Sequence, residues 1–380
     1  ELVSGIDKNL ESTKEELQSI KQLNFTSNEA DLKLANCYII TVPTPINESK
    51  EPNLNPLSKA SEIVAKFIKK GDLIIYESTV YPGCVEEHCV PLLEKFSGLN
   101  FNQDFFCGYS PERINPGDKV HTISKVKKIT SGSTPEITDL VDNLYKEIIT
   151  VGTHKASSIK VAEAAKIIEN TQRDINIAFI NELYILFNKL NIDTKAVLDA
   201  AESKWNFLPF KPGLVGGHCI GVDPYYLTHK AESIHYKPKV ISAGRKINDS
   251  MGDYVALELM NKMKQKNIKI KGAKILIMGL TFKENCADIR NSGIQSVILK
   301  LKKYKCNLDL YDPWADSKEI KKTYNIYPLS KLNQKTYDSI LIAVGHKKFK
   351  IMGMKFISNL CKKNHIIFDL KYLFSNSKVN

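Results

Sequence analysis

Short strand-like runs alternate with helical stretches at both ends of the chain, and this alternation constrains the fold more than any other feature. The first third holds helical stretches near residues 56–69 and 85–96 between strand-like runs at 37–42, 72–76 and 105–109. The rhythm returns in the last third, where strand-like runs occupy residues 275–278, 308–312, 339–344 and 365–370. Strands joined through helices pair in parallel, so the sequence predicts an α/β fold with two doubly wound, Rossmann-like domains on parallel sheets.

A long helical pattern separates these two blocks. Residues 157 to about 190 contain neither glycine nor proline, and this pattern far exceeds the average globular helix of about 11 residues. We expect a long central helix that joins the two doubly wound domains. A chain of 380 residues is long enough for several cores, and we divide it into domains at residues 1–156, 157–260 and 261–380.

The charge balance favours an anionic partner but does not indicate its chemical class. The chain carries 54 basic and 42 acidic residues, a net charge of +12, which suits nucleic acid, a lipid surface or a phosphorylated small molecule. The lysines are spread along the chain, and no basic stripe with interleaved aromatic residues marks a nucleic-acid site. We therefore expect neither nucleic acid nor membrane as partner, and a basic binding protein with salt-sensitive DNA retention is the alternative from another class.

Cysteine usage favours the cytoplasm. The eight cysteines include no Cys-x-x-Cys pair, which is typical of reduced thiols rather than of a disulfide framework. No apolar run is long enough to span a bilayer, and the first residues lack the features of a secretory signal. Cys84, His88 and Cys89 have no second ligand pair at zinc spacing, so we interpret them as a helix face and expect no metal site.

Polar residues follow each strand-like run of the first domain. They are Pro43 and Thr44, Glu77 to Thr79, and Ser110 to Arg113. Ligands of open parallel sheets bind beyond the carboxyl ends of the strands, so this edge is a candidate binding site. Ordinary turn and capping chemistry explains any single one of these residues at least as well.

Asp7 ends the apolar stretch 2–6, which we expect to be a strand. An acidic side chain there would accept hydrogen bonds from an adenosine ribose and would favour NAD over NADP, although Lys8 would also tolerate a 2′-phosphate. No Gly-x-Gly-x-x-Gly turn precedes this stretch, and only three residues separate Asp7 from Glu11. We expect the full coding sequence to contain that turn and a helix after Asp7.

The glycine-rich segment around Cys219 is the strongest local signal. Four of the 19 glycines lie between Gly213 and Gly221, which lets the backbone pass close to a ligand. A helix that begins after this turn would place the thiol near unpaired backbone N–H groups and favour a nucleophilic thiolate. A lone cysteine is more often a buried structural residue, but the glycines and Asp223, four residues later, favour the nucleophile here.

One face of the long helix is polar. The polar positions are Lys166, Asn170, Asp174 and Asn181, and the apolar positions opposite are Ala165, Ile168 and Ile175. Such a row is either solvated surface or the lining of a cleft, and the pattern leaves both open. In a cleft, Lys166 could stabilise an oxyanion.

Two cations, Lys283 and Arg290, follow the strand-like run 275–278. Their position beyond the end of a strand suits a diphosphate, and the bidentate geometry of arginine suits it especially. Exposed loop charges are the alternative interpretation, and it is slightly favoured by the pattern alone.

With these motifs in this order, the chain resembles the UDP-glucose/GDP-mannose dehydrogenase family over nearly its whole length. The matching segments lie at residues 76–83, 109–117, 162–170, 216–219 and 282–290. Residues 205–227 are similar to the bacterial branch that acts on UDP-N-acetylhexosamines in surface polysaccharide pathways such as capsule or O-antigen. The resemblance implies an NAD-binding first domain, a central domain with the cysteine loop that forms a homodimer, and a UDP-sugar-binding last domain.

The resemblance also implies a four-electron oxidation by NAD of the C6 alcohol of UDP-GlcNAc, UDP-GalNAc or UDP-ManNAc to the uronic acid. Cys219 would capture the aldehyde as a thiohemiacetal, which becomes a thioester and is hydrolysed. Lys166 and Asn170 would stabilise oxyanions, and Asp223 would support water or proton transfer. Glu112 and Thr79 would act near the hydrolytic step.

The implied binding residues follow from the same matching segments. Those for the cofactor are Asp7, Pro43, Thr44, Thr79, Glu112 and Arg290. Those for the substrate are Glu112, Arg113, Lys166, Asn170, Phe210, Lys211, Gly213, Gly216 and Lys283, the last on its phosphate. Within enzymes, the alternatives are a UDP-glucose 6-dehydrogenase and a dehydrogenase that oxidises a hydroxy acid once and needs no thiol.

Overall fold

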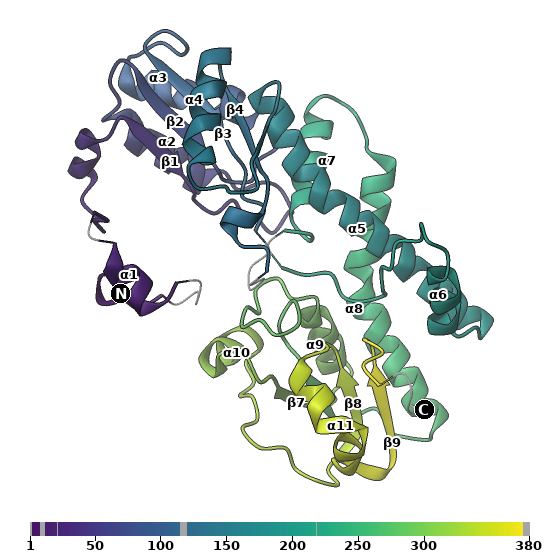
Figure 1. Ribbon diagram of the computed structural model, residues 1–380. Coiled ribbons are helices and arrows are strands. Elements are labelled where there is room, and N and C mark those ends of the chain that lie inside the picture. Colours follow the sequence, from purple (N-terminus) through teal and green to yellow (C-terminus); the bar gives the residue numbers. More distant parts are fainter. Residues whose placement is uncertain (1, 8–11, 21, 115–119, 218, 375–380) are drawn as a thin grey trace. The chain divides into compact units, whose positions relative to one another are not determined.

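The structure is a computed structural model that describes residues 2–7, 12–20, 22–114, 120–217 and 219–374. The chain forms two compact units, residues 1–167 and 168–380. The first unit carries a five-stranded sheet in the order β1-β2-β3-β4-β5, and the second carries a four-stranded sheet in the order β7-β6-β8-β9 (Figure 1). The predicted α/β class with two such sheets is confirmed, whereas the division into three domains stays a prediction.

The first unit follows the predicted alternation closely. Its strands are β1 (Cys37–Ile40), β2 (Asp72–Tyr76), β3 (Phe105–Tyr109), β4 (Lys128–Gly132) and β5 (Thr153–Lys155). Its helices are α1 (Lys14–Ser19), α2 (Asn55–Ala65), a π-helical turn (Val85–Cys89) that leads into α3 (Val90–Ser97), and α4 (Pro135–Lys146). The π-helical turn confirms the helix face expected for Cys84, His88 and Cys89.

Strand β2 shows why the sheet has helices on both faces. All five of its residues are buried, and successive side chains of a strand point to opposite faces. Ile74 and Tyr76 belong to the apolar cluster that includes α2 and α3, whereas Leu73 and Ile75 pack with Val141 of α4. A continuous apolar run is therefore typical of a doubly covered parallel strand.

One pair of strands in this sheet is antiparallel, and it involves β4, a strand that the sequence did not predict. β1, β2 and β3 run parallel, but β4 pairs with β3 in the opposite direction. A parallel partner requires a crossover connection, usually a helix. Between β3 and β4 the described residues form only the single 3₁₀ turn Ile123–Lys125, so the chain returns in the opposite direction.

The structure contradicts the strand expected at residues 2–6. Leu2–Ser4 forms a 3₁₀ turn and Gly5 has a φ of +75°, so the backbone is not extended. Leu2, Val3 and Ile6 are all exposed, and a strand without a partner or a buried face has nothing to stabilise it. Asp7 accepts a hydrogen bond from the backbone N–H of Ser12 at 3.0 Å, and its proposed contact with a ribose stays a prediction.

The predicted long helix is α5 (Ile159–Leu190), which spans 32 residues. It is followed by α6 (Thr194–Glu202), α7 (Asp223–Ser233) and α8 (Lys239–Gln265). The remaining elements are β6 (Lys274–Met278), α9 (Ile294–Lys303), β7 (Asn307–Tyr311), α10 (Ser317–Tyr324), β8 (Tyr337–Ile342), α11 (Lys347–Asn359) and β9 (Cys361–Asp369). The four predicted strands of this region are confirmed, although β9 begins earlier than expected.

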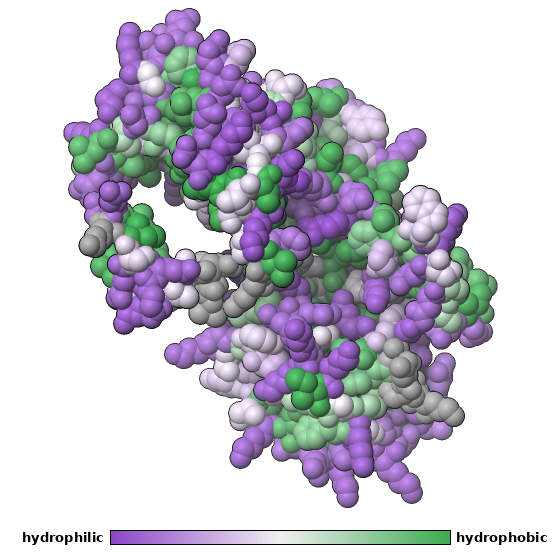
Figure 2. Space-filling view, viewed as in Figure 1, coloured by the Kyte–Doolittle hydropathy of each residue, from purple (hydrophilic) through white to green (hydrophobic). Residues whose placement is uncertain are grey.

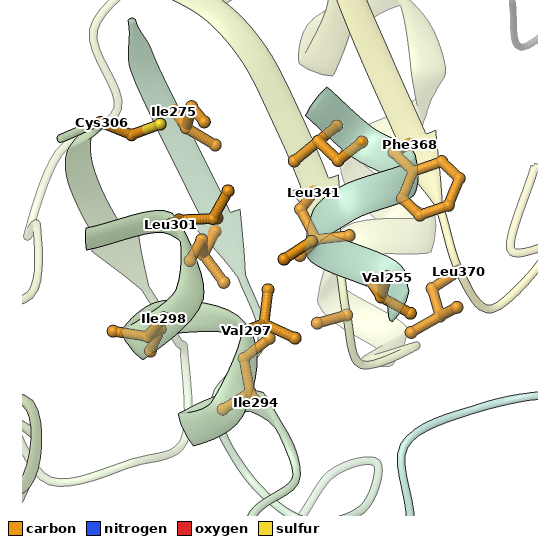
Figure 3. Close-up of a cluster of buried hydrophobic side chains, with 14 of the residues drawn as sticks. Val255, Ile275, Ile294, Val297, Ile298, Leu301, Cys306, Leu341, Phe368 and Leu370 are labelled. Atoms are coloured by element: carbon orange, nitrogen blue, oxygen red, sulfur yellow. The ribbon is translucent and has the colours of Figure 1, made fainter. Parts of the chain in front are cut away.

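The core of the second unit forms between its sheet and two helices (Figure 3). Helix α9 contributes one stripe at helical spacing, made of Ile294, Val297, Ile298 and Leu301. This stripe packs with Val255 of α8 and with side chains of the strands, among them Ile275, Leu341 and Phe368. The apolar stripe therefore fixes which face of α9 meets the sheet.

Hydrophilic side chains cover much of the face shown in Figure 2, interrupted by apolar patches. Within the described residues, no helix combines the length and the apolar character needed to cross a membrane. All eight cysteines lie in the described part, and none of them forms a disulfide.

Two glycines of α8 give a matched test of the packing between α8 and α9. A Cβ at Gly252 would lie 2.5 Å from Ser296 Cβ and 3.2 Å from the Gly293 carbonyl oxygen, whereas at Gly244 its nearest neighbour would be at 3.5 Å. Gly252→Ala should lower the free energy of unfolding by about 1–3 kcal/mol. Gly244→Ala should be neutral or stabilising by up to about 1 kcal/mol, because alanine is the better helix former. Urea denaturation of both variants measures the difference, and equal values would contradict this packing.

Candidate active site

The polar row on α5 is buried. Asp174 and Asn181 are fully buried and Lys166 and Asn170 nearly so, whereas Ile168 on another face is 55 % exposed. Of the two alternatives that the pattern left open, the burial of these four residues excludes the solvated surface. Burial of so many polar groups is unfavourable unless each is hydrogen-bonded. The contacts of these side chains therefore show which other segments of the protein the helix is bound to.

Asp174 is paired by residues of α8. Arg245 Nη1 lies 2.5 Å from Asp174 Oδ1, and Asn248 Nδ2 donates to the same oxygen at 2.8 Å. Burial raises the pKa of Asp174, and the neighbouring Arg245 opposes that effect. Arg245 also pairs with Asp249, so one guanidinium serves two carboxylates.

Asn181 connects α5 to the glycine-rich loop. Its Nδ2 donates to the Gly213 carbonyl oxygen at 3.0 Å, and its Oδ1 accepts from the Gly213 N–H at 2.9 Å. The amide thus pairs with both backbone groups of one residue, as a neighbouring strand would. The same Nδ2 donates to Asn248 at 2.8 Å, which ties this contact to the Asp174 cluster.

The loop then passes so close to the residues after β6 that two of its positions require glycine. A Cβ at Gly216 would lie 2.6 Å from the Asn291 carbonyl oxygen, and one at Gly217 would lie 2.7 Å from the Phe282 ring. Gly217 also has a φ of +87°, a conformation that favours glycine. The group approached here is protein, and the close approach to a ligand expected from the four glycines stays a prediction.

Cys219 lies in the turn directly before α7 and is partly buried. Its carbonyl oxygen accepts hydrogen bonds from the N–H groups of Val222 at 3.1 Å and Asp223 at 2.8 Å. The predicted helix after the loop is confirmed. Cys219 therefore lies directly before the N-terminus of α7, and its ionisation to a thiolate stays a prediction.

Asp223 is the first residue of α7 and is buried. Its Oδ2 accepts a hydrogen bond from Asn170 Nδ2 at 2.5 Å. Arg173 in turn donates to Asn170 Oδ1. The structure thus brings Asn170, Asp223 and the Cys219 turn together, as the sequence interpretation required, while their chemical roles stay predictions.

The two cations after β6 differ in their surroundings. Arg290 is 64 % exposed and is held by Asp288 through Nε at 3.0 Å and Nη2 at 2.7 Å. Lys283 Nζ lies 5.7 Å from the centre of the Phe282 ring, the ring that covers Gly217. Lys283 is therefore carried by the same segment that supports the cysteine loop.

Buried His346 anchors this segment. Its Nδ1 accepts the N–H of Asn285 at 2.9 Å, so Nε2 carries the proton in the neutral ring. Asp312 Oδ2 lies 3.1 Å from Nε2 and accepts a hydrogen bond from it. The pair holds the turn that carries Lys283.

Sequence reasoning missed Lys371. It follows β9, and its Nζ would lie 2.9 Å from a Cβ placed on Gly213, so the amine reaches the start of the cysteine loop. Burial lowers the pKa of Lys371, and the charge of Glu284 opposes that effect. The signal was its position directly beyond a strand, the same signal that pointed to Lys283.

In the first unit, the predicted residues gather at the carboxyl edge of the sheet. Thr44 Oγ1 donates to the Thr79 carbonyl oxygen at 2.7 Å, which joins the ends of β1 and β2. Glu112 Oε1 accepts the N–H groups of Arg113 and Ile114, each at 2.6 Å. Pro43 is exposed beside them. The edge is hydroxyl- and carboxylate-rich as expected.

Buried Glu163, near the start of α5, contacts the residues that follow Thr79. Its two carboxyl oxygens accept the N–H groups of Gly83 at 2.5 Å and Val85 at 2.9 Å. Burial raises the pKa of Glu163 to about 8, against the effect of these two hydrogen bonds. The acid thus connects α5 to the segment after β2, a contact that the sequence interpretation did not foresee.

Comparison with known proteins gives one consistent result. Three models of the UDP-glucose/GDP-mannose dehydrogenase family match, the NAD binding domain at residues 3–149, the central domain at 160–250 and the UDP binding domain at 276–376. These matches cover most of the chain. They also fall on the segments described above, with the Cys219 loop in the central match.

Two curated relatives and one solved structure extend this similarity over the full length. The UDP-N-acetyl-D-glucosamine 6-dehydrogenase of Salmonella typhi is 59% identical over 98% of this chain and 88% of its own length. The Pseudomonas aeruginosa protein of the same name is 59% identical over 100% and 90%. A UDP-D-ManNAc dehydrogenase structure from Pyrococcus horikoshii superposes with a TM-score of 0.83 at 29% identity, over 96% of this chain and 84% of that one.

The Arg245–Asp174 pair should contribute far more to stability than the exposed Arg290–Asp288 pair. The side chains are 6% and 0% exposed in the first pair, against 64% and 21% in the second. Arg245→Met should lower the free energy of unfolding by about 3–5 kcal/mol, because it leaves a buried carboxylate unpaired. Arg290→Met should change it by less than about 1 kcal/mol. Chemical denaturation measures both, and similar losses would show that the buried row does not hold the second unit together.

Proposed function

The chain belongs to the UDP-glucose/GDP-mannose dehydrogenase family, and from this premise we propose that it oxidises the C6 alcohol of a UDP-N-acetylhexosamine to a carboxylate. It is an NAD-dependent dehydrogenase with a UDP-binding domain. The observation that carries the proposal is the partly buried Cys219 in a glycine turn before α7, beside the Asn170–Asp223 pair. Such a turn offers a thiol that is both accessible and favoured as a thiolate.

NAD fits the carboxyl edge of the first sheet. The hydroxyls and carboxylates of Thr44, Thr79 and Glu112 stand beyond the ends of parallel strands, where nucleotides bind in open sheets. When bound, NAD⁺ supplies the hydride acceptor for each of the two oxidations. Pro43 and Arg290 belong to the proposed cofactor contacts, and so does Asp7.

Cys219 acts between the two oxidations. After the first hydride leaves the C6 alcohol and its hydroxyl proton is released, the thiolate attacks the aldehyde carbon and forms a thiohemiacetal. Loss of a second hydride gives a thioester. Water then attacks the thioester carbonyl, the C–S bond breaks, and the thiolate leaves with the carboxylate as product.

The remaining side chains have separate proposed roles. Lys166 and Asn170 stabilise the negative charge that develops on the substrate oxygen, a role that suits buried polar donors. Asp223 orients Asn170 through their hydrogen bond and supports proton transfer. Glu112 and Thr79 act in the hydrolysis of the thioester.

The substrate diphosphate requires cations that the second unit provides. Lys283 lies beside Phe282, and Lys371 reaches Gly213 at the start of the cysteine loop. We assign both to the diphosphate. The other proposed substrate contacts are Phe210, Lys211, Gly213 and Gly216 of the loop, and Arg113 of the first unit.

Among the hexosamines, we favour N-acetyl-D-glucosamine. The two relatives named for that sugar are 59% identical to this chain, and the solved protein named for the manno epimer is 29% identical. The uronic acid product suits the synthesis of a surface polysaccharide in the cytoplasm.

We also propose a homodimer formed through α5. Val161, Ile168, Phe179 and Leu186 are exposed, although they are large and apolar. Their spacings of seven and eleven residues place them on one stripe of the helix. An exposed apolar stripe on a long helix is typical of an interface.

Replacement of Cys219 tests the covalent route. Cys219→Ser should abolish formation of the uronic acid, because the hydroxyl is a much weaker nucleophile, while the circular dichroism and melting temperature stay at wild-type values. The test substrate is UDP-N-acetylglucosamine with NAD⁺, and product is measured by mass spectrometry. Full turnover by the variant would exclude the thiohemiacetal.

Two glycines of the same loop provide a matched pair. Gly217→Ala forces an L residue to a φ of +87° and against the Phe282 ring, so the loop must move. A shift of about 1 Å in such a group can lower the rate roughly 100-fold, and we expect a loss of at least about 10-fold in kcat/KM. At Gly221 the nearest atom to a new Cβ is 3.7 Å away, so Gly221→Ala should stay within about threefold of wild type. If both variants kept the wild-type rate, the loop geometry would not control the reaction.

A further inference from the structure

Lys128, the first residue of β4, is a buried cation at the functional edge of the first sheet. Its side chain is 4% exposed. Nζ lies 3.1 Å from Glu77 Oε2 and 3.3 Å from the Pro111 carbonyl oxygen. It also lies 3.7 Å from Glu112 Oε2 and 5.0 Å from the centre of the Tyr145 ring. None of the roles proposed above involves this lysine.

The antiparallel pairing of β3 and β4 brings Lys128 to this edge. Gly108 pairs with Gly132 and Tyr109 with Ser131, and the same register continued beyond the strand ends sets Lys128 opposite Glu112. A parallel β4 would have carried its first residue to the other end of the sheet. Lys128 therefore meets residues that follow two other strands, Glu77 after β2 and Pro111 and Glu112 after β3.

The two carboxylates near Lys128 have different surroundings. The Glu77 side chain is 14% exposed, and its second oxygen accepts a hydrogen bond from the Tyr145 hydroxyl, so both of its oxygens are engaged within the protein. The Glu112 side chain is 43% exposed. Glu77 thus compensates the buried charge, and Glu112 is the acid that remains accessible to a substrate or water.

Glu112 is held from two sides. Its Oε1 accepts the backbone N–H groups of Arg113 and Ile114, and its Oε2 faces the ammonium of Lys128. An ammonium group attracts a nearby carboxylate, and a carboxylate that is held in place can accept a proton from water. The backbone contacts fix Oε1, and without Lys128 the second oxygen would lose its charged neighbour.

We propose that Lys128 is a positioning residue for the hydrolytic step, which it serves by holding the Glu112 carboxylate in its orientation. The inference rests on the proposed function, in which Glu112 acts on the thioester. In that step the Glu112 carboxylate takes a proton from water as the water oxygen bonds to the thioester carbonyl carbon. The C–S bond then breaks, and Cys219 leaves as a thiolate.

Lys128→Met in the full chain tests this role, because methionine keeps much of the apolar stem but carries no charge. The variant should give a rapid burst of two NADH per subunit from UDP-N-acetylglucosamine, followed by steady-state turnover that is roughly 10- to 100-fold slower than wild type. Mass spectrometry after acid quench should find the thioester accumulated on Cys219. Lys128→Arg, which restores a cation, should recover turnover to within about tenfold of wild type.

Three results would overturn the inference. They are wild-type turnover by Lys128→Met, an equal loss of burst and steady-state rates, or no recovery with arginine. Should Lys128→Met fail to fold, Lys128→Gln goes through the same assay, since its amide can still donate to Glu77 without a charge. Failure of the proposed function looks different, because the wild-type enzyme would then reduce no NAD⁺ with this sugar or form no adduct on Cys219.

Discussion

The buried polar row of α5 is the constraint on which the second unit's site depends. Asn181 holds Gly213 at the start of the cysteine loop, and Asn170 holds Asp223 at its end. These two asparagines are eleven residues apart, which corresponds to about 16 Å along a helix. A rigid helix thus fixes both ends of the segment that carries Cys219.

Burial makes this arrangement specific. An unsatisfied polar group in a core is unfavourable by about 1–3 kcal/mol, and a displaced loop would break the hydrogen bonds of Asn181 with Gly213 and of Asp223 with Asn170. The glycines act in the same direction, because Gly216 and Gly217 allow the loop to lie against the residues after β6. One consequence is that the segment carrying Lys283 and the loop carrying Cys219 support each other.

Local patterns in the sequence predicted most of the fold. β2 and β3 match their predicted bounds because each is a short, mostly apolar run between turns, and α5 was evident from an uninterrupted helical pattern. The apolar run at residues 2–6 led to a wrong prediction of a strand, because apolar residues do not form a strand without a pairing partner. The antiparallel β4 was missed because strand direction depends on the connection and not on the strand itself.

The candidate site, like the fold, was predictable only where the signal was local in the sequence. Glycine spacing identified the Cys219 loop, and position after a strand identified Thr79, Glu112 and Lys283. Whether the polar row of α5 faced solvent could not be decided, because its partner Arg245 is 71 residues further along the chain. Lys128 escaped notice for a similar reason, as its contacts with Glu77 and Glu112 exist only once three strands have assembled.

The most direct measurement counts reduced cofactor for each sugar oxidised. Full-length protein is incubated with NAD⁺ and a limiting amount of UDP-N-acetylglucosamine, and the absorbance of NADH is followed to completion while the sugar product is identified by mass. A four-electron oxidation through Cys219 predicts two NADH per sugar and a uronic acid as product. One NADH per sugar, with the product left at the aldehyde, would contradict a thioester at this cysteine.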